Sequence, residues 1–311
     1  AGLVVGDLLL EVNGESIKGY EVSKVSSMLK GTPGTTLHLK VRKLLTGQEE
    51  ELTFKRERIV VSGIPYWSVI DDSIGYIVHK DFSEDCSNDI RNAVMSMKKA
   101  GIKGLIIDLR GNGGGILQEA VKILSMFVPK GTEVVSMRGR MKELDATFVT
   151  QSEPIDTQIP VAVLINSSSA SAAEIVAGAF QDLDRGVLLG QRSFGKGLVQ
   201  STRPVGYNAY LKLTTAKYYT PSGRCIQAID YSHRAEDGSV GTVPDSLIKE
   251  YATKAGRKVY DGGGVMPDIT TSPEYISRFA MTLYALGFIE DFGDEYTRRN
   301  PGRQIDIRTF S

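Results

Sequence analysis

One serine and one lysine stand in short segments of small residues that suit nucleophilic chemistry. Ser171 lies within residues 166–174, Asn-Ser-Ser-Ser-Ala-Ser-Ala-Ala-Glu, and Lys196 follows it by 25 positions between two glycines. A serine hydroxyl is a weak nucleophile until a base removes its proton, and a neutral lysine amine can serve as that base. The pair therefore predicts acyl transfer by a serine nucleophile that works without a histidine.

The neighbours of Lys196 favour a neutral amine. Phe194, Leu198 and Val199 are apolar, and burial among apolar groups lowers the pKa of a lysine. Gln200 comes four residues later, so in a strand its side chain falls on the same face as that of Lys196. We expect the Gln200 amide oxygen to accept a hydrogen bond from the lysine amine and to hold that amine in place.

Backbone N–H groups that can stabilise an oxyanion are expected close to the serine. Ser171 follows a predicted buried strand and stands at the head of a predicted helix, where the Ala172 N–H is free to donate. A glycine run at 111–115 ends another strand-like stretch upstream, and either Gly113 or Gly114 can supply the second donor. The fold must bring these loops together for the chemistry to work.

Each segment also has an alternative interpretation. Ser171 and Glu174 match a capping box, in which the serine only caps its helix. Lys196 between glycines can be an ordinary loop lysine. The run 111–115 can be a dinucleotide-binding loop, although it lacks the third glycine of the usual pattern.

The histidines and cysteines form no recognisable site in the sequence. His38, His79 and His233 lie far apart and not at the spacing of metal ligands, so we expect none of them to be catalytic. Cys86 and Cys225 are too few for a disulfide framework. We therefore expect no metal and no organic cofactor.

Length and composition indicate a globular protein with more than one domain. The chain has 311 residues, of which 41% are hydrophobic, enough for two or three packed domains. Its 37 basic residues balance 37 acidic ones, which gives no support for nucleic acid or a membrane surface as the main partner. No apolar run approaches the roughly 20 residues that cross a bilayer. The chain opens on Ala1 without a signal-peptide pattern, and we expect it to come from a longer precursor.

Strand-like and helix-like segments alternate through the central part of the chain. This alternation predicts an α/β fold with a mostly parallel sheet flanked by helices. The expected strands are 74–78, 104–109, 133–137, 161–165, 187–189 and 211–219, and the expected helices are 89–100, 116–127, 171–180 and 277–288. A small β-rich module precedes this region, with strands at 8–12 and 36–42 and a helix at 22–29. Residues 229–264 are polar and glycine-rich, with no clear periodicity.

In combination, these segments closely resemble the carboxyl-terminal processing proteases, also called tail-specific proteases, of peptidase family S41. The matching stretches are 103–117, 160–182, 190–200, 216–227 and 262–269. The resemblance implies that Ser171 is the nucleophile, Lys196 the general base and Gln200 the residue that orients the lysine. It also implies oxyanion donation by the Ala172 N–H and by a glycine N–H within 113–114.

Residues 1–43 resemble the later part of the PDZ domain of this family. Such domains bind an extended C-terminal tail by strand addition beside a helix, for which Val22, Val25 and Leu29 are the candidate groove residues. The chain is therefore divided into four parts. These are a partial PDZ domain at 1–43, a charged connector at 44–65, a protease core at 66–270 and a helical extension of unassigned role at 271–311.

The resemblance implies a serine endopeptidase that cuts protein substrates near flexible, apolar C-terminal tails through an acyl-enzyme. Its partners would be proteins or peptides with accessible C-terminal tails, and the formation of a homo-oligomer is left open. It would work in the periplasm or cell envelope of a bacterium. The rival interpretations are a catalytically silent, PDZ-bearing adaptor and a dinucleotide-binding enzyme that uses residues 111–115.

Overall fold

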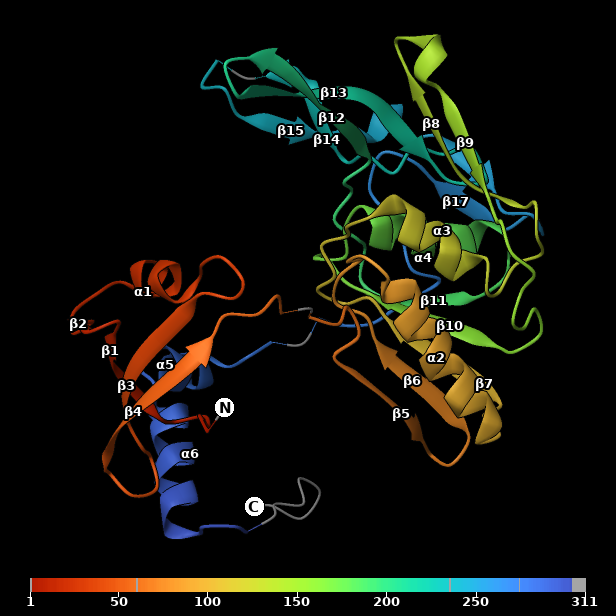
Figure 1. Ribbon diagram of the computed structural model, residues 1–311. Coiled ribbons are helices and arrows are strands. Elements are labelled where there is room, and N and C mark those ends of the chain that lie inside the picture. The colour runs from red at the N-terminus through yellow and green to blue at the C-terminus, as the bar shows by residue number, and fades with distance from the viewer. Residues whose placement is uncertain (1, 60, 235, 274, 304–311) are drawn as a thin grey trace. The chain divides into compact units, whose positions relative to one another are not determined.

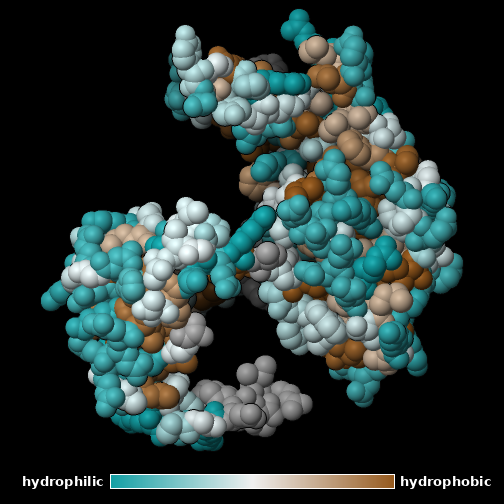
Figure 2. Space-filling view, in the orientation of Figure 1, coloured by the Kyte–Doolittle hydropathy of each residue, from teal (hydrophilic) through white to brown (hydrophobic). Residues whose placement is uncertain are grey.

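The computed structural model describes residues 2–59, 61–234, 236–273 and 275–303 (Figure 1). Contacts divide the chain into two compact units. The first contains Ala1–Val61 together with Glu274–Ser311, and the second contains Ser62–Pro273. On the face shown in Figure 2, hydrophilic residues cover most of each unit and hydrophobic residues form small separate groups.

A four-stranded antiparallel sheet and three helices make up the first unit. The strand order is β2-β1-β3-β4. The elements are β1 Leu8–Val12, β2 Glu15–Ser16, α1 Val22–Leu29, β3 Thr36–Arg42, β4 Glu49–Lys55, α5 Arg278–Ala285 and α6 Phe288–Arg299. Leu37, Leu39 and Val41 alternate along β3 and pack with Val12 in the core, as a half-buried strand requires. Strand β4, which lies in the stretch expected to be a connector, pairs with β3 along its whole length.

The C-terminal extension forms two helices where the sequence predicts a single helix at 277–288. The Ser277 side chain caps α5 by accepting a hydrogen bond from the Ala280 N–H at 3.1 Å. Gly287 then adopts a φ of 76°, a left-handed conformation that glycine tolerates without strain, and the chain turns there into α6. A side chain on Gly6 would meet Asp294 of α6, so the extension packs against the small β-rich module.

A six-stranded sheet forms the centre of the second unit, in the order β18-β11-β10-β7-β6-β5 (Figure 1). Its strands are β5 Tyr66–Ile70, β6 Ile74–Val78, β7 Gly104–Asp108, β10 Val161–Ile165, β11 Val187–Gly190 and β18 Ile269–Thr270. All neighbours are parallel except β5, which pairs antiparallel with β6 at one edge. The predicted α/β fold with a mostly parallel sheet is therefore confirmed.

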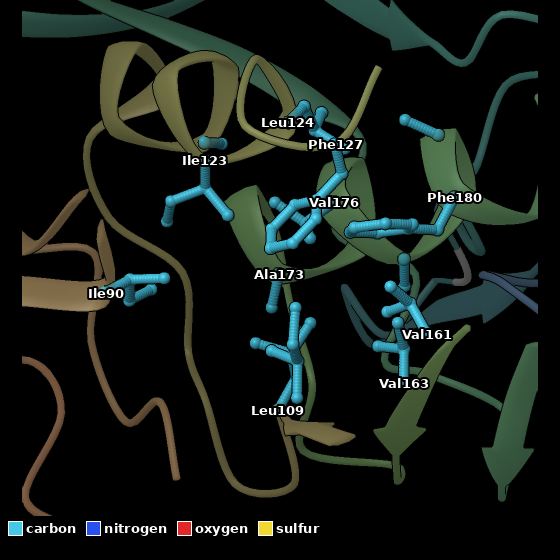
Figure 3. Packing of buried hydrophobic residues seen from close by; sticks show 14 of the residues in the cluster. Ile90, Leu109, Ile123, Leu124, Phe127, Val161, Val163, Ala173, Val176 and Phe180 are labelled. Atoms are coloured by element: carbon cyan, nitrogen blue, oxygen red, sulfur yellow. The ribbon is translucent and has the colours of Figure 1, made fainter. Parts of the chain in front are cut away.

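Helices from three segments of the described chain pack against this sheet. They are α2 Cys86–Lys99, α3 Leu117–Leu124 and α4 Ala172–Asp182. Every residue of α4 is buried. Figure 3 shows Val176 and Phe180 of α4 above Val161 and Val163 of β10, and the ring centroids of Phe127 and Phe180 lie 5.7 Å apart. A helix buried on all sides has little freedom to shift, so the residue that precedes it is held in place.

The remaining strands of the second unit form antiparallel ribbons. A four-stranded sheet has the order β12-β13-β8-β9, and β14–β15 and β16–β17 are separate hairpins. The elements are β8 Glu133–Gly139, η1 Lys142–Leu144, β9 Ala146–Val149, β12 Leu198–Gly206, β13 Ala209–Tyr219, β14 Ile229–Arg234, β15 Val240–Thr242, η2 Asp245–Leu247, β16 Glu250–Ala252 and β17 Lys258–Tyr260. Both hairpins thus arise from the stretch 229–264, in which the sequence shows no periodicity.

A fully buried ion pair ties the end of α4 to the loop after β13. Arg224 Nη2 donates to Asp182 Oδ1 at 2.9 Å and to Gln181 Oε1 at 2.7 Å. Both charged side chains of the pair have no exposed surface. A charge this deeply buried depends on its partner, because water cannot replace that partner.

Asp182→Ala is expected to lower the free energy of unfolding by about 3–5 kcal/mol, because the Arg224 guanidinium is left buried without its counterion. Urea unfolding followed by the fluorescence of Trp67, the single tryptophan of the chain, measures the change in this unit. The exposed Lys258–Glu250 pair provides the control, and Glu250→Ala should cost less than about 1 kcal/mol. Equal losses of unfolding free energy in the two variants would contradict the stabilising role of the buried Asp182–Arg224 pair.

Candidate active site

Two loops at the carboxyl ends of neighbouring parallel strands bring the glycine run and Ser171 together. The glycine run follows β7, and Ser171 lies in the loop that follows β10. A Cβ atom on Gly114 would lie 2.7 Å from the Ser171 Cβ and 3.0 Å from the Ala172 nitrogen. Gly114 also has a φ of 96°. Only glycine allows this close approach, so the run serves to place backbone beside the serine.

Hydrogen bonds hold the two loops against each other. The Ala170 N–H donates to the Asn112 carbonyl at 2.9 Å, and Ser169 Oγ donates to the Leu109 carbonyl at 2.8 Å. Ser169 and Asn112 are both fully buried. Their polar groups are therefore committed to these contacts, and the geometry around the serine is rigid.

The two candidate oxyanion glycines differ in what their N–H groups do. The Gly114 N–H donates to Asn112 Oδ1 at 2.8 Å and is therefore already engaged. Gly113 is exposed, and a Cβ atom placed on it would meet no atom within 4 Å. No hydrogen bond from the Gly113 N–H occurs within the part of the chain that the structure describes. Of the two N–H groups, that of Gly113 is therefore the one without a hydrogen bond among the described residues.

Ser171 occupies a strained backbone conformation immediately before α4. Its φ of 56° and ψ of −117° lie outside the regions that residues with a side chain favour. Such strain costs on the order of 1–3 kcal/mol and persists only where the surroundings enforce it. The Ser171 N–H donates to Glu174 Oε2 at 2.9 Å, which contributes to that enforcement.

Glu174 joins the backbone of the serine to the loop that carries the lysine. Its Oε2 accepts from the N–H groups of Ser171 at 2.9 Å and Lys196 at 2.8 Å. Its Oε1 accepts from the Gly195 N–H at 2.7 Å and from Ser193 Oγ at 2.5 Å. The residue is 0% exposed. Burial raises the pKa of the Glu174 carboxyl, while these hydrogen bonds act in the opposite direction.

From the sequence, Glu174 has no expected role beyond capping its helix. One signal for a larger role was available, because Glu174 is followed by Ile-Val-Ala-Gly-Ala-Phe, a run typical of a buried helix. A carboxylate that begins such a helix needs several donors to offset the cost of its burial. Which donors these are depends on a loop about twenty residues later in the chain.

The two glycines that flank Lys196 are required for packing. A Cβ atom on Gly195 would lie 2.2 Å from the Ala228 Cβ, and one on Gly197 would lie 2.7 Å from the Gln227 nitrogen. Gln227 Oε1 also accepts from the Gly197 N–H at 2.8 Å. The loop that carries Lys196 therefore packs closely against the segment that follows Cys225.

The side chains of Lys196, Leu198 and Gln200 line one cavity of about 620 Å³. Strand β12 begins at Leu198, so Lys196 precedes the strand, and the expected strand alternation does not reach it, although both Lys196 and Gln200 line this cavity. Lys196 is exposed, where the sequence analysis expected burial. Among the described residues, no hydrogen bond joins the Ser171 hydroxyl, the Lys196 amine and the Gln200 amide to one another. The fold brings the backbones of Ser171 and Lys196 together and leaves the lysine side chain open to solvent.

A polar cluster that the sequence analysis did not single out fixes the start of the glycine loop. Arg110 Nε and Nη2 donate to the Asp108 carboxylate, and the Tyr76 hydroxyl donates to Asp108 Oδ2 at 2.7 Å. Burial alone would raise the pKa of Asp108, but the hydrogen bonds from Arg110 and Tyr76 lower it below its usual value. A charged Asp108 therefore anchors the chain three residues before Gly111.

His79 is buried and lies behind the glycine loop. Its carbonyl accepts from Asn112 Nδ2 at 2.8 Å, and its ring packs on Phe82. Burial lowers the pKa of His79 to about 4, so the ring is neutral near pH 7. His38 lies in the first unit with its Nδ1 3.0 Å from Thr53 Oγ1.

The side chain of His233 lies outside the described residues. Within the described part of the chain, no group of three or more His, Cys, Asp or Glu residues is arranged to hold a metal, and no helix is long and apolar enough to cross a membrane. Gly115 forms a β-bridge with Phe82 and packs against its carbonyl, so this end of the glycine run is used for packing.

Helix α1 carries the three candidate groove residues in the first unit. Leu29 packs against the core cluster of that unit. Val25 is half-buried, and Val22 is 83% exposed. The three side chains therefore run from the core of the small module to its surface.

Comparison with known proteins identifies the relatives of this chain. The model of peptidase family S41 matches residues 73–245, and a PDZ domain model matches residues 1–43. A carboxy-terminal-processing protease of Bartonella bacilliformis is 35% identical over 254 residues, which cover 80% of this chain and 55% of the relative. A probable CtpA-like serine protease of Staphylococcus saprophyticus is 33% identical over 254 residues, which cover 81% of this chain and 48% of the relative. The chain thus spans about half the length of the curated relatives it matches.

A solved structure has the same fold. The photosystem II D1 C-terminal processing protease superimposes with a TM-score of 0.53 at 24% sequence identity. The superposition covers 89% of this chain and 66% of that protein. It supports the α/β assignment of the second unit and the presence of a smaller β-rich module.

The buried ring of His79 is expected to make the second unit sensitive to acid. Its pKa is about 4 in the folded chain against an ordinary value of 6.5, so the unfolded chain binds the extra proton between these values. The free energy of unfolding should therefore fall by about 3 kcal/mol as the pH drops from about 6.5 to about 4. Urea titrations followed by Trp67 fluorescence measure this fall. The variant His79→Gln lacks the titrating ring. A fall of the same size in this variant would show that His79 does not cause the acid sensitivity.

Proposed function

This chain belongs to peptidase family S41, and we propose that it is a serine endopeptidase with Ser171 and Lys196 as its catalytic dyad. The observation that carries the proposal is the Glu174 carboxylate, which accepts hydrogen bonds from the backbone N–H groups of both residues. A structural cap would need only the first of these bonds. A link between the two loops is what a shared reaction centre requires.

The proposed reaction proceeds in two stages. The neutral Lys196 amine takes the proton from Ser171 Oγ as this oxygen attacks the peptide carbonyl and forms a C–O bond. Lys196 then gives the proton to the leaving amine as the C–N bond breaks, which leaves an acyl group on Ser171. Water attacks the ester with Lys196 again as the base, and the second product is released.

Two backbone N–H groups are proposed to stabilise the oxyanion. The Ala172 N–H lies at the first position of α4, where N–H groups lack partners within the helix. The Gly113 N–H is the second donor, because the Gly114 N–H is already bonded to Asn112. A single donor of this kind changes the turnover number by about a hundredfold to a thousandfold.

Substrate binding would bury the Lys196 amine and thereby favour its neutral form. The lysine is exposed in the free chain, and a substrate segment placed in the adjoining cavity would exclude water from its amine. Gln200 lines the same cavity and offers an amide oxygen to the neutral amine. We therefore assign Gln200 the role of orienting Lys196 in the substrate complex.

The substrates are proposed to be proteins with flexible, apolar C-terminal tails. The names of the relatives, carboxy-terminal-processing and CtpA-like protease, support this class. Residues 1–43 would receive such tails by strand addition beside α1, with Val22, Val25 and Leu29 toward the tail. We place the enzyme in the bacterial periplasm or cell envelope, where the family resemblance puts it.

Cleavage of an unstructured protein with an apolar C-terminus tests the dyad. The parent chain should cut it, and Ser171→Ala and Lys196→Ala should each lower kcat by more than about a thousandfold, because either change removes the activated nucleophile. Lys212→Ala, at an exposed lysine of β13 outside the cavity, is the matched control and should keep full activity. Activity retained without Lys196 would refute the lysine base, and an inactive parent would favour the adaptor.

Glu174→Gln tests the link between the loops. The amide keeps the size of the side chain but presents N–H donors to a position that must accept, so kcat should fall by about 10–100-fold with little change in KM. Glu119→Gln is the control, because Glu119 is also buried and its hydrogen bonds go to Ser87 and Lys122 and not to the loops of Ser171 and Lys196. Its kcat should match that of the parent. An unchanged kcat in a folded Glu174→Gln variant would remove Glu174 from the site.

A further inference from the structure

A second groove lies on the antiparallel sheet of the second unit, and the charged side chains that line it are cationic. It has a volume of about 440 Å³ and is lined by residues of β8, β12 and β13 and of the turn that follows β8. Its four cationic side chains are all exposed, and they are those of Arg138, Arg140, Lys142 and Lys217. Among the residues that the structure describes, no acidic side chain lines this groove, which we call the basic groove.

Two of these cations stand directly opposite each other in the sheet. Lys217 of β13 pairs with Arg138 of β8 in the antiparallel register, so both side chains lie on one face. The Arg138 guanidinium also lies 4.9 Å from the centroid of the Tyr219 ring, a contact that leaves its charge in place. Like charges that face each other across two strands are destabilising, and an anion bound between them would relieve this repulsion.

The chain supplies little negative charge of its own to this groove. Asp145 Oδ2 lies 3.5 Å from Lys142 Nζ, and the other oxygen of this carboxylate accepts from a backbone N–H at the end of β8 at 2.7 Å. Within the described part of the chain, Arg138, Arg140 and Lys217 form no ion pair. Three cations are therefore available to a ligand, and a groove lined by one sign of charge concentrates ligands of the opposite sign.

The basic groove continues into the cavity that Lys196 lines. Leu198, Thr214 and Lys217 line both spaces, and Leu198 follows Lys196 by two residues. An extended peptide advances about 3.3 Å per residue, so a substrate with its scissile bond at the proposed dyad would reach the groove within a few residues. This continuity favours a peptide as the occupant. A nucleic acid is less suited, because the 37 basic residues of the chain are balanced by 37 acidic ones.

We propose that the basic groove binds acidic segments of protein substrates, with Arg138, Arg140 and Lys217 as the residues that select Asp and Glu side chains. The inference rests on the proposed peptidase function and adds a second site of substrate selection to it. The planar guanidinium group is suited to carboxylates, because it can donate two parallel hydrogen bonds to one of them. The groove would thus favour substrates with acidic residues a few positions from the scissile bond.

Peptide binding to Ser171→Ala tests the groove without turnover. A fluorescein-labelled peptide with a short run of Glu beside an apolar stretch should bind at least about tenfold more tightly than the same peptide with Gln in place of Glu, at about 0.05 M salt. The difference should shrink to less than about threefold at about 0.5 M salt, because salt screens exposed charges. Fluorescence anisotropy measures both dissociation constants. Equal affinities at low salt would overturn the proposal.

Arg138→Gln combined with Arg140→Gln removes two cations of the groove and should abolish the preference for the Glu peptide. Neither residue lines the lysine cavity, so the affinity for the Gln peptide should stay the same. Arg203→Gln combined with Lys212→Gln is the matched control, since it removes two exposed cations of β12 and β13 that lie outside the groove. The control should keep the preference. An equal loss of preference in the two double variants would refute selection by the groove.

The same assay tests a nucleic acid as the rival occupant. A labelled single-stranded oligothymidylate should bind more weakly than the Glu peptide at the same salt concentration. Tighter binding of the oligonucleotide, lost when Arg138 and Arg140 are replaced by Gln, would assign the groove to nucleic acid and overturn the proposal.

Cleavage assays separate this proposal from the peptidase proposal. The parent chain should cleave the Glu peptide with a kcat/KM about tenfold above that for the Gln peptide, through a lower KM. Arg138→Glu combined with Arg140→Glu should reverse the preference toward a peptide with Lys at these positions. If the parent cleaves and binds both peptides equally, the groove proposal fails and the peptidase proposal stands. If the parent cleaves neither peptide while Ser171→Ala prefers the Glu peptide, the peptidase proposal fails and the groove stands as a binding site.

Discussion

The Glu174 carboxylate is the contact on which the arrangement of this site depends. A charged group with no exposed surface is costly unless donors surround it, and here four donors from two loops do so. Because those donors belong to Ser171 on one side and to Ser193, Gly195 and Lys196 on the other, the cost of burial is offset only when both loops are in place. The proposed nucleophile and base are thus positioned through their backbones by a side chain that need not touch the substrate.

Close backbone approach is the second constraint, and it explains where the glycines stand. Gly114 lies against Ser171, and Gly195 and Gly197 lie against the segment that contains Gln227, at distances that no Cβ atom would allow. The helix that follows Ser171 is buried on all sides and cannot move to relieve these contacts. The rigid backbone therefore contrasts with the Lys196 side chain, which remains exposed beside a large cavity.

Much of this fold follows from local patterns, and the remainder depends on distant contacts. The strand at 161–165 and the helix at 22–29 were predicted at their observed bounds, because each shows a clear apolar period. The short hairpins within 229–264 and the break at Gly287 were missed, since three of the four hairpin strands span only three residues and show no period, and a glycine inside an apolar run does not reveal its φ. The role of Glu174 and the exposure of Lys196 were missed for a related reason. Both are set by loops that only the tertiary fold brings together.

The central claim is that Ser171 is an acylated nucleophile that Lys196 activates. The most direct test is mass spectrometry of the chain mixed with an apolar peptide ester and quenched in acid within the first turnover. The account predicts an added acyl mass on the proteolytic fragment that contains Ser171, and its absence in Lys196→Ala. An adduct on another residue, or an equal adduct formed at an equal rate in Lys196→Ala, would contradict the account.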